Sequence, residues 1–371
     1  MAEINENLDW RGAVRKRPAM YVGSLRIEGF VHLLKDFFAS FHTYIDTSRF
    51  GHNIPKLIFD AEKSSFEISD IQSGLFRLEK LKNPVPSNIN ENLHLYGFDF
   101  AVLNALSQVY EFRLFNQNKN LIIEQIYEKG ILQSGIVDEK EYSCDALEIK
   151  FTLDSTIWEQ FEFNPIFITA IIQELAFLNK EKTFELKYSV NNEPCRIIYH
   201  FENGLRDLIE IKGFNGWGST VFATELDFES EDYSADICFS FWDYSINEPF
   251  FKSFVNNLYT HEGGTHKKAL LLGISKALKK YVKENKSDDF FVITDRTILS
   301  CLIGAIHLKM KQPSFYGSTR NRLSNKEIVK PISDFIFENV YERLKSDEET
   351  ANKVIRHFYE IHWNKKWLKR L

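Results

Sequence analysis

The chain has 371 residues, of which 44% are hydrophobic and 26% charged, and its formal net charge is −6. A chain of this length suits two domains of roughly 150–200 residues each better than a single core. The composition excludes an intrinsically disordered protein, and the negative charge excludes one that coats nucleic acid over its whole surface.

No apolar run approaches the ~20 residues that a membrane span requires, and the N-terminal segment MAEINENLDWRG contains no apolar signal core. The four cysteines lie far apart and form no CxxC pair, so neither a zinc site nor a redox switch is expected. Isolated thiols are typical of a reducing compartment. We therefore expect a globular cytoplasmic protein without a membrane segment.

The first part of the chain is expected to mix strands and helices. Residues 57–72 alternate apolar and polar positions around a KSS turn, which predicts a β-hairpin. Residues 101–109 instead have helical spacing, with Val102, Leu103, Leu106 and Val109 on one side. The other elements predicted here are a hairpin over 111–127, a strand over 146–153, a helix from Pro165 and the strand TFELKYSV.

A change of composition predicts where the domains divide. The segment GFNGWGS (213–219) concentrates glycine and serine between two periodic regions. We therefore expect a first domain over residues 1–214 and a second over 215–371.

The second part opens with strands around 220–226 and 236–242. A Gly-Gly turn at 263–264 is expected to open a helix over 266–282, because glycine adopts the positive φ that such a turn needs. The order of strand, turn, helix and strand over 236–310 predicts an α/β unit with a crossover. Two further helices are expected over about 326–345 and 348–369.

The chain contains seven stretches with a distinctive residue pattern: VRKRPAMYVGS (14–24), VLNALSQVYEF (102–112), IIEQIYEKG (122–130), ELAFLN (174–179), YHFENGLRDLIE (199–210), VNNLYTHEGGTH (255–266) and PSFYGSTRNRLSNKEI (313–328). In sequence, order and spacing they resemble the gyrase B and topoisomerase IV B family. The resemblance covers nearly the entire chain, so it is specific.

The resemblance implies a GHKL (Bergerat-type) α/β sandwich followed by a transducer domain with a ribosomal S5-like fold, a fold class of α+β/α/β. In the family this pair closes as an ATP-driven dimer gate around DNA. The chain ends just after the transducer's last helix, so we expect the acidic Toprim region, and with it DNA cleavage, to be absent.

The family hydrolyses ATP with a carboxylate that activates water and an Asn oxygen on Mg²⁺. Matched from Gly29, the resemblance assigns the first position to Asp36 and the second to Ser40, while a further family Asp becomes Thr43. Asp would sit roughly 1–1.5 Å farther back than the usual Glu, which costs on the order of 100-fold in rate. Ser40 cannot present a carbonyl oxygen to a hard cation. Asp36 can equally be a solvated helix residue.

The adenine motif of the family corresponds to ISDIQSGLF (68–76), where the family has an Asp followed by two spaced glycines and a proline. Asp70 and Gly74 remain, whereas Gln72 replaces the first glycine and Phe76 the proline. The Asp70 carboxylate can still accept a hydrogen bond from an amine. The Cβ of Gln72, however, crowds the backbone where the base should lie flat.

The segment LHLYGFD (93–99) stands where the family has a GLHGVG lid. Only Gly97 survives, and His94, Tyr96 and Asp99 occupy the other key positions. A carboxylate about 4 Å from a phosphate oxygen is repelled by roughly 4 kcal/mol per unit charge at an effective dielectric of ~20. We therefore expect no triphosphate to bind in the family's manner. The aromatic residues of this segment either fill the space or hold a different small ligand.

The transducer loop that carries Gln-Thr-Lys in the family reads Ser-Thr-Arg here and ends at Arg320. Arg320 keeps the positive charge and would bind phosphate in isolation. Beside a degraded pocket we interpret it as a domain-docking or surface cation. His261 and His266 flank the Gly-Gly turn without further ligands in metal spacing, so no metal site is expected.

These substitutions favour a gyrase B-like pseudo-ATPase that acts as a binding or assembly subunit in a DNA-associated complex, without a cofactor. The alternative enzyme is a divergent ATPase that uses ATP and Mg²⁺ through Asp36, Asp70, Gly97 and Arg320, together with a separate cleavage subunit. The expected partner is a second copy or another protein.

A third interpretation, from a different class, is a DNA clamp that works without ATP. Its basic face would be one lysine-rich helix, with Lys267, Lys268, Lys276, Lys279, Lys280 and Lys283. Such a surface predicts DNA affinity that falls steeply with salt. The same residues can instead form a solvent-exposed helix face without a binding function.

Overall fold

The computed structural model describes residues 10–44, 56–60, 65–71, 98–116, 121–139, 146–159, 165–180, 183–190, 193–213, 220–242, 250–285, 293–317 and 320–368. The chain forms two compact units, Met1–Glu202 and Asn203–Leu371, each described below by itself. Helix α7 (Leu205–Gly213), which the expected boundary at residue 214 places in the first domain, packs on strands of the second unit. None of the described helices is long and apolar enough to cross a membrane.

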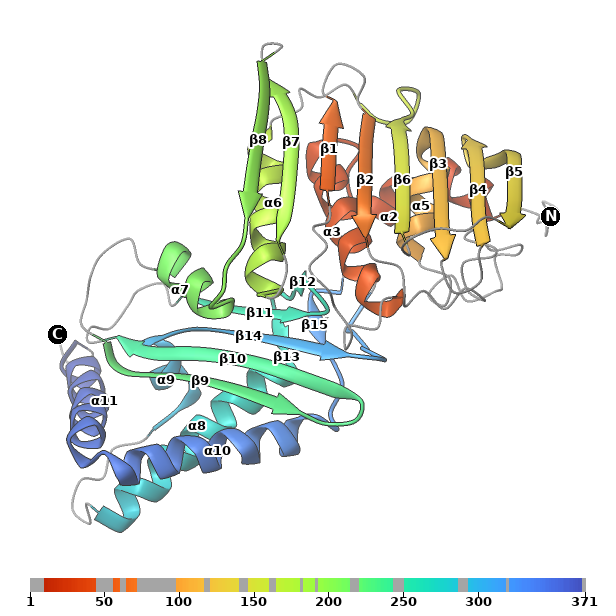
Figure 1. The fold of residues 1–371 in the computed structure, drawn as a ribbon. Helices are drawn as coiled ribbons and strands as arrows, with labels where there is room; N and C mark the ends of the chain where they lie inside the picture. Colours follow the sequence, from red (N-terminus) through yellow and green to blue (C-terminus); the bar gives the residue numbers. More distant parts are fainter. Residues whose placement is uncertain are drawn as a thin grey trace, which may run out of the picture. The chain divides into compact units, whose positions relative to one another are not determined.

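The first unit is built on an eight-stranded sheet in the order β5-β4-β3-β6-β2-β1-β7-β8 (Figure 1). Neighbouring strands are antiparallel except β1 and β7, which run parallel. The strands are β1 (Lys56–Asp60), β2 (Ser65–Ile71), β3 (Ser107–Asn116), β4 (Leu121–Glu128), β5 (Ile131–Glu139), β6 (Ala146–Leu153), β7 (Phe184–Val190) and β8 (Glu193–Tyr199).

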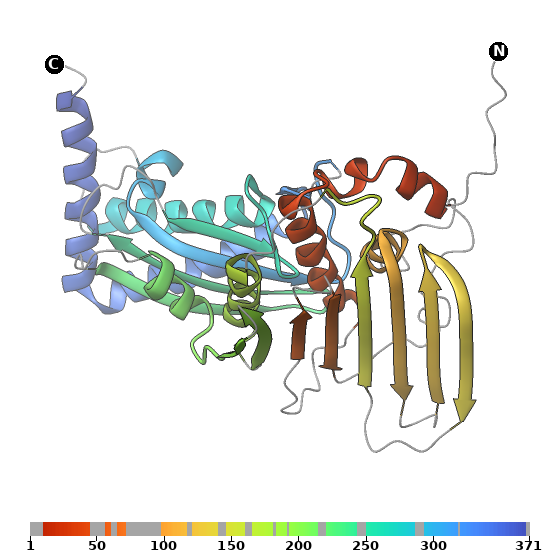
Figure 2. The same ribbon diagram turned by 90° about the horizontal axis from the view of Figure 1, so that it is seen from above.

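Helices cover one face of this sheet and enclose the first core. They are α1 (Trp10–Lys16), α2 (Ala19–Val22), α3 (Ile27–Tyr44), α5 (Phe98–Ala105) and α6 (Pro165–Leu178). The first three, red in Figure 2, lie together on one side of the strands. Alternate strand residues such as Tyr110, Phe112 and Phe151 are buried against Phe30 and Leu34 of α3. The first unit is therefore a two-layer α/β sandwich.

The second unit has a five-stranded sheet in the order β12-β11-β14-β10-β9. Its strands are β9 (Thr220–Glu229), β10 (Tyr233–Trp242), β11 (Phe251–Val255), β12 (Leu258–Tyr259) and β14 (Leu302–Met310). Strands β11 and β14 are parallel and joined through helix α8 (Thr265–Asn285), which confirms the crossover predicted over 236–310. A small parallel pair links β13 (Gly263–Gly264) with β15 (Arg322–Leu323).

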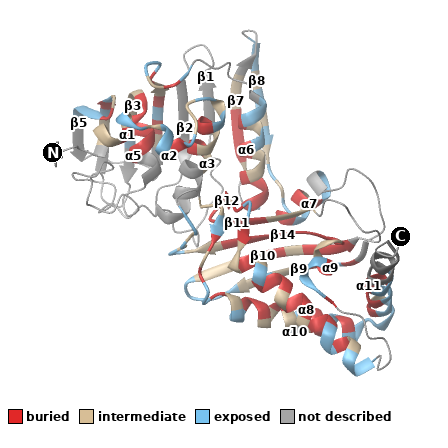
Figure 3. Cartoon of the chain, turned by 180° about the vertical axis from the view of Figure 1, so that it is seen from behind, coloured by how far each residue is buried: buried red, intermediate tan, exposed pale blue. Residues whose placement is uncertain are grey.

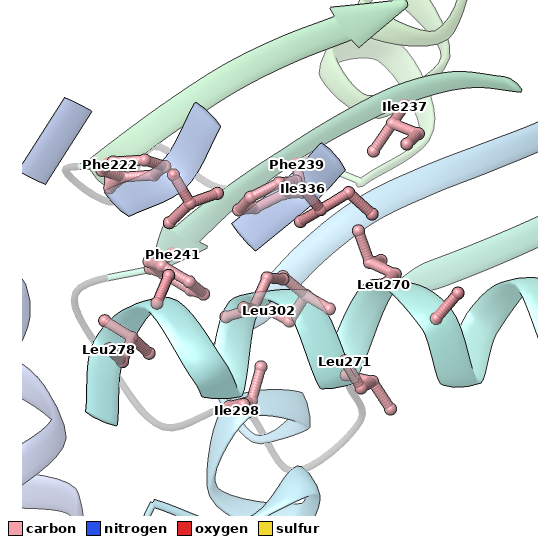
Figure 4. Packing of buried hydrophobic residues seen from close by; sticks show 14 of the residues in the cluster. Phe222, Ile237, Phe239, Phe241, Leu270, Leu271, Leu278, Ile298, Leu302 and Ile336 are labelled. Carbon is pink, nitrogen blue, oxygen red and sulfur yellow. The ribbon is translucent and has the colours of Figure 1, made fainter. Parts of the chain in front are cut away.

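Helices α8 and α10 (Val329–Ser346) pack on each other and cover one face of the second sheet. Phe239 and Phe241 of β10 point toward Leu270, Leu278 and neighbouring apolar residues of this layer (Figure 4). Strand β14 is almost wholly buried, as the red colouring of Figure 3 shows. Helices α9 (Asp295–Leu299) and α11 (Glu348–Leu368) complete the unit.

Most of the predicted elements are present, with one notable difference. The hairpins expected over 57–72 and 111–127 are confirmed as β1–β2 and β3–β4. The helix expected over 101–109 is α5, but it ends at Ala105, and Val109 already lies in β3. Tyr110 and Phe112 alternate with polar residues from that point, so a two-residue period replaces the helical one.

Candidate functional site

The residues expected at the nucleotide site fall on several elements. Asp36 and Ser40 lie one turn apart on α3, so their positions share one helix face. Asp70 is in β2, while Gly74 and Gly97 lie outside the described residues. Arg320 belongs to the second unit. The described part of the chain thus brings Asp36, Ser40 and Asp70 into one unit.

Asp70 lies at an irregularity of the sheet. The pairing of β2 with β6 shifts register between Ile68 and Ile71, and Asp70 falls inside that interval. A bulge bends a strand and changes where its side chains point, and bulges are frequent beside functional sites. The apolar alternation of β2 breaks at the same place, because Asp70 stands where an apolar residue is due after Phe66 and Ile68, and Ile71 follows one residue later.

Helix α3 is held firmly up to the position of Asp36. Phe30 is fully buried and its ring contacts that of Trp158 edge-on, with centroids 5.9 Å apart. One residue before Asp36, the Lys35 ammonium lies 3.3 Å from the Glu174 carboxylate of α6. The helix that carries the base position is therefore fixed by both packing and an ion pair.

Helix α5 begins at Phe98, inside the segment LHLYGFD (93–99), so Asp99 is its second residue. Its C-terminal end is tied to distant segments. The Arg15 guanidinium donates a hydrogen bond of 2.7 Å to the Ala105 carbonyl. The Leu106 carbonyl accepts a hydrogen bond of 3.0 Å from the Trp158 indole. Carbonyls that a helix end leaves without partners are thus satisfied by side chains.

An ion pair anchors this arrangement. Arg15 Nη2 lies 2.6 Å from Asp154 Oδ2, and the Asp154 side chain has no solvent exposure. Burial alone would raise the pKa of the Asp154 carboxyl. Hydrogen bonds from Thr156 and Arg15 outweigh it and hold the pKa below its ordinary value. Asp154 is therefore an ionised structural residue.

Asn104 is a buried polar residue of α5 that sequence reasoning missed. Its side chain is 1% exposed, and among the described residues neither its amide nitrogen nor its amide oxygen has a hydrogen-bond partner. An unsatisfied buried polar group costs about 1–3 kcal/mol. The sequence signal was a polar residue inside the apolar run VLNAL. In the structure its neighbours Ala101, Val102, Leu103 and Ala105 are all fully buried.

In the second unit, the loop between β14 and β15 carries the phosphate-loop candidate Arg320. Its φ of 54° lies in the left-handed region that residues other than glycine seldom adopt. Two residues on, the Arg322 guanidinium lies over the Tyr316 ring, 5.0 Å from its centroid.

The Gly-Gly turn opens α8 as expected. Gly263 and Gly264 have φ of 70° and 135°, and a Cβ on Gly264 would lie 2.5 Å from the Leu323 backbone. His266 is fully buried and hydrogen-bonds to the Thr260 hydroxyl at 3.2 Å. Burial, followed by the nearby charge of Lys267, lowers the pKa of His266 to about 3. The neutral imidazole is part of the core packing here.

The lysines expected to form a basic face differ in their surroundings. Lys276 pairs with Asp334 at 2.9 Å. Lys280 lies 4.0 Å from Glu284 and 4.1 Å from the centroid of the Tyr341 ring. Lys267 is half-buried, and burial lowers its pKa. The other three members, Lys268, Lys279 and Lys283, are exposed.

No group of three or more His, Cys, Asp or Glu side chains that could hold a metal ion occurs within the ranges given above.

An eight-stranded sheet with helices on one face, followed by an α/β unit with a parallel crossover, is the architecture of a GHKL fold joined to a transducer-type domain. Two solved structures share this fold over almost the whole chain. The 43K ATPase domain of Thermus thermophilus gyrase B covers 97% of this chain and 96% of its own, with a TM-score of 0.72 and 19% identity. The topoisomerase IV ATP-binding domain of Francisella tularensis covers 95% and 97%, with a TM-score of 0.74 and 20% identity.

The sequence comparisons agree with the fold. The family model DNA gyrase B matches residues 204–366. The DNA gyrase B protein of Clostridium acetobutylicum is 29% identical over 92% of this chain and 56% of the relative. The DNA topoisomerase 4 B protein of Rickettsia conorii is 27% identical over 97% and 57%. These matches support the DNA gyrase B and topoisomerase IV B family for this chain, which spans about half the length of these relatives.

Proposed function

We propose that this chain is a binding or assembly module that has kept the gyrase B scaffold and lost ATP hydrolysis. The observation that carries the proposal is a contrast within one unit. The frame around α5, with its Arg15 and Trp158 hydrogen bonds, is complete. The residues at the nucleotide-contact positions, in contrast, are Asp36, Ser40 and Asp99.

The position of Asp99 supports this proposal. The first turn of a helix presents backbone N–H groups and a partial positive charge, which attract anions such as phosphate. As the second residue of α5, Asp99 brings its own negative charge to that turn. A carboxylate at this position in the sequence would disfavour a phosphate at that turn, because the two charges have the same sign.

Calorimetric titration with a non-hydrolysable ATP analogue and Mg²⁺, alongside a phosphate-release assay, tests the proposal. We expect no binding up to millimolar analogue and no Mg²⁺-dependent turnover. Micromolar binding would contradict the proposal and favour the ATPase alternative.

A reversion variant sharpens this test, because it asks whether the frame can still hold a nucleotide. It combines Asp36→Glu, Ser40→Asn, Gln72→Gly, His94→Gly and Asp99→Gly. We expect it to gain measurable binding. The matched control carries five substitutions at exposed surface residues of α10 and α11, where no gain is expected.

The alternative of a divergent ATPase has one observation in its favour, the register shift at Asp70. If β2 directs that carboxylate into a reshaped pocket, Asp70 could still bind an adenine amine. This alternative predicts turnover that Asp70→Asn abolishes and that Asp334→Asn, in the second unit, leaves unchanged.

The DNA clamp rests on Lys268, Lys279 and Lys283, three exposed lysines of α8. Changing all three to Glu should weaken DNA retention and reduce its salt dependence if they contact phosphates. We expect no difference from the unmodified chain in a filter-binding salt titration. A clear loss of DNA retention in the triple variant would support the DNA clamp.

A further inference from the structure

The two edges of the first sheet differ in how they are protected. Strand β8 ends the sheet on one side and β5 on the other (Figure 1). An edge strand offers a row of unpaired N–H and C=O groups, and proteins usually protect it with charges or proline. An edge strand without such protection is open to pairing with a strand of another chain.

Strand β8 carries such protection. Pro194 lacks a backbone N–H and so cannot donate to an added strand. The Arg196 guanidinium lies 2.6 Å from the Glu185 carboxylate, which is 4% exposed. This edge therefore presents a proline and a fixed ion pair to an approaching strand.

Strand β5 has neither a charge nor a proline along most of its length, and its one protective feature there is a bulge at Gln133. The residues from Ile131 to Val137 read ILQSGIV, without a charge or a proline. Ile131 is 49% exposed and Leu132 51% exposed, and Ile126 of the adjoining strand is 41% exposed. Within the described ranges, no strand pairs with the outer side of β5.

The charges at the two ends of β5 make the edge complementary to itself. Lys129 stands in the turn before the strand, and Asp138 and Glu139 are its last residues. Two copies related by a two-fold axis near Ser134 would run antiparallel, so Lys129 of one copy would meet the acidic end of the other. The uncharged segment between them would lie against itself, with Leu132 of one copy opposite Ile136 of the other.

We propose that a second copy of this chain pairs with the first through antiparallel β5 strands, extending one sheet into the other. Backbone hydrogen bonds supply the attraction, and the end charges select the antiparallel direction over the parallel one. Gln133 is an extra residue opposite the Ile126–Tyr127 step. Such a bulge increases the local twist and limits edge pairing there, so the second copy pairs along the remaining residues of β5. The contact is small, so the dimer is reversible.

Sedimentation velocity of the full chain, from low to high micromolar concentration, tests this inference. We expect a concentration-dependent dimer that Leu132→Lys abolishes. Ile198→Lys on the opposite edge strand is the matched control, because Ile198 is 49% exposed against 51% for Leu132. A monomer at every concentration, or a dimer unaffected by Leu132→Lys, would overturn the proposal.

A charge exchange tests the direction of pairing. Lys129→Glu and Glu139→Lys should each weaken the dimer, since each places like charges at both ends. The double variant should restore it, because the exchanged charges again meet across the two-fold axis. Failure of the double variant to recover, with both single variants folded by circular dichroism, would exclude this arrangement. Nucleotide is omitted throughout, so the outcome is independent of the proposed function.

Discussion

Arg15 joins three segments that are far apart in the sequence. One guanidinium nitrogen donates to the Ala105 carbonyl and the other lies against the Asp154 carboxylate. Arg15→Ala would leave that buried carboxylate without its cation, and such a change costs about 3 kcal/mol or more. Denaturant unfolding followed by tryptophan fluorescence should show the loss in the first unit.

The matched control for this prediction is another arginine–carboxylate pair. Arg26 lies 2.5 Å from Glu159, but the two side chains are 69% and 55% exposed. Water screens an exposed pair, so Arg26→Ala should change the free energy of unfolding little. Equal losses in the two variants would mean that burial does not set the strength of the Arg15 pair.

His266 gives the second unit a dependence on acid. Its pKa is about 3 in the folded chain and about 6.5 when unfolded. Between these values the unfolded state binds a proton that the folded state does not. The contribution to stability therefore falls as pH falls below about 6.5, by at most ~1.4 kcal/mol per pH unit.

His266→Gln removes this titration and keeps a donor for the Thr260 hydroxyl. The free energy of unfolding, measured at several mildly acidic pH values, should depend less steeply on pH in the variant. An unchanged slope would show that other groups cause the acid sensitivity.

Among the elements, the crossing of α8 and α10 depends on one small residue. A Cβ at Gly273 would lie 2.7 Å from both the Ile336 Cβ and the Ser333 carbonyl oxygen. Gly273→Ala should gain ~1 kcal/mol in helix propensity but lose about 1–3 kcal/mol through overpacking. We expect a net loss of stability by thermal unfolding. Lys279→Ala, at an exposed position of the same helix, should show none.

The elements with a clear period were predictable from the sequence. The alternation around the KSS turn indicated the β1–β2 hairpin, and the apolar spacing after Pro165 indicated α6. The end of α5 was not predictable from period alone, because the apolar residues run on into β3. Strand pairing across the chain, such as β1 with β7, depends on tertiary packing that local patterns do not encode.

The candidate site was only partly accessible to sequence reasoning. The resemblance assigned positions to Asp36 and Ser40, and the structure places both on one helix, α3. The break in the alternation at Asp70 was visible in β2, whereas the buried amide of Asn104 and the double role of Arg15 are products of long-range contacts. The effect of the substitutions on nucleotide binding remains a prediction.

For the whole molecule, two separate hydrophobic cores predict two unfolding events. One core is built around Phe30, Phe112 and Phe151, the other around Phe239, Leu270 and Ile336. Differential scanning calorimetry should resolve two transitions. Arg15→Ala should lower the temperature of one, and Gly273→Ala that of the other. A single transition shifted by both variants would show that the units unfold together.

The parallel pairing of β1 with β7 bears on how the chain is made. Lys56 of β1 lies opposite Glu185 of β7. Because these residues are far apart in the sequence, β1 leaves the ribosome long before β7, the strand that pairs with one of its two edges. During synthesis at ~5–20 residues per second, that edge stays open for several seconds or more. The first sheet closes only when nearly all of its unit has emerged, so the order of synthesis leaves β1 exposed to mispairing until β7 arrives.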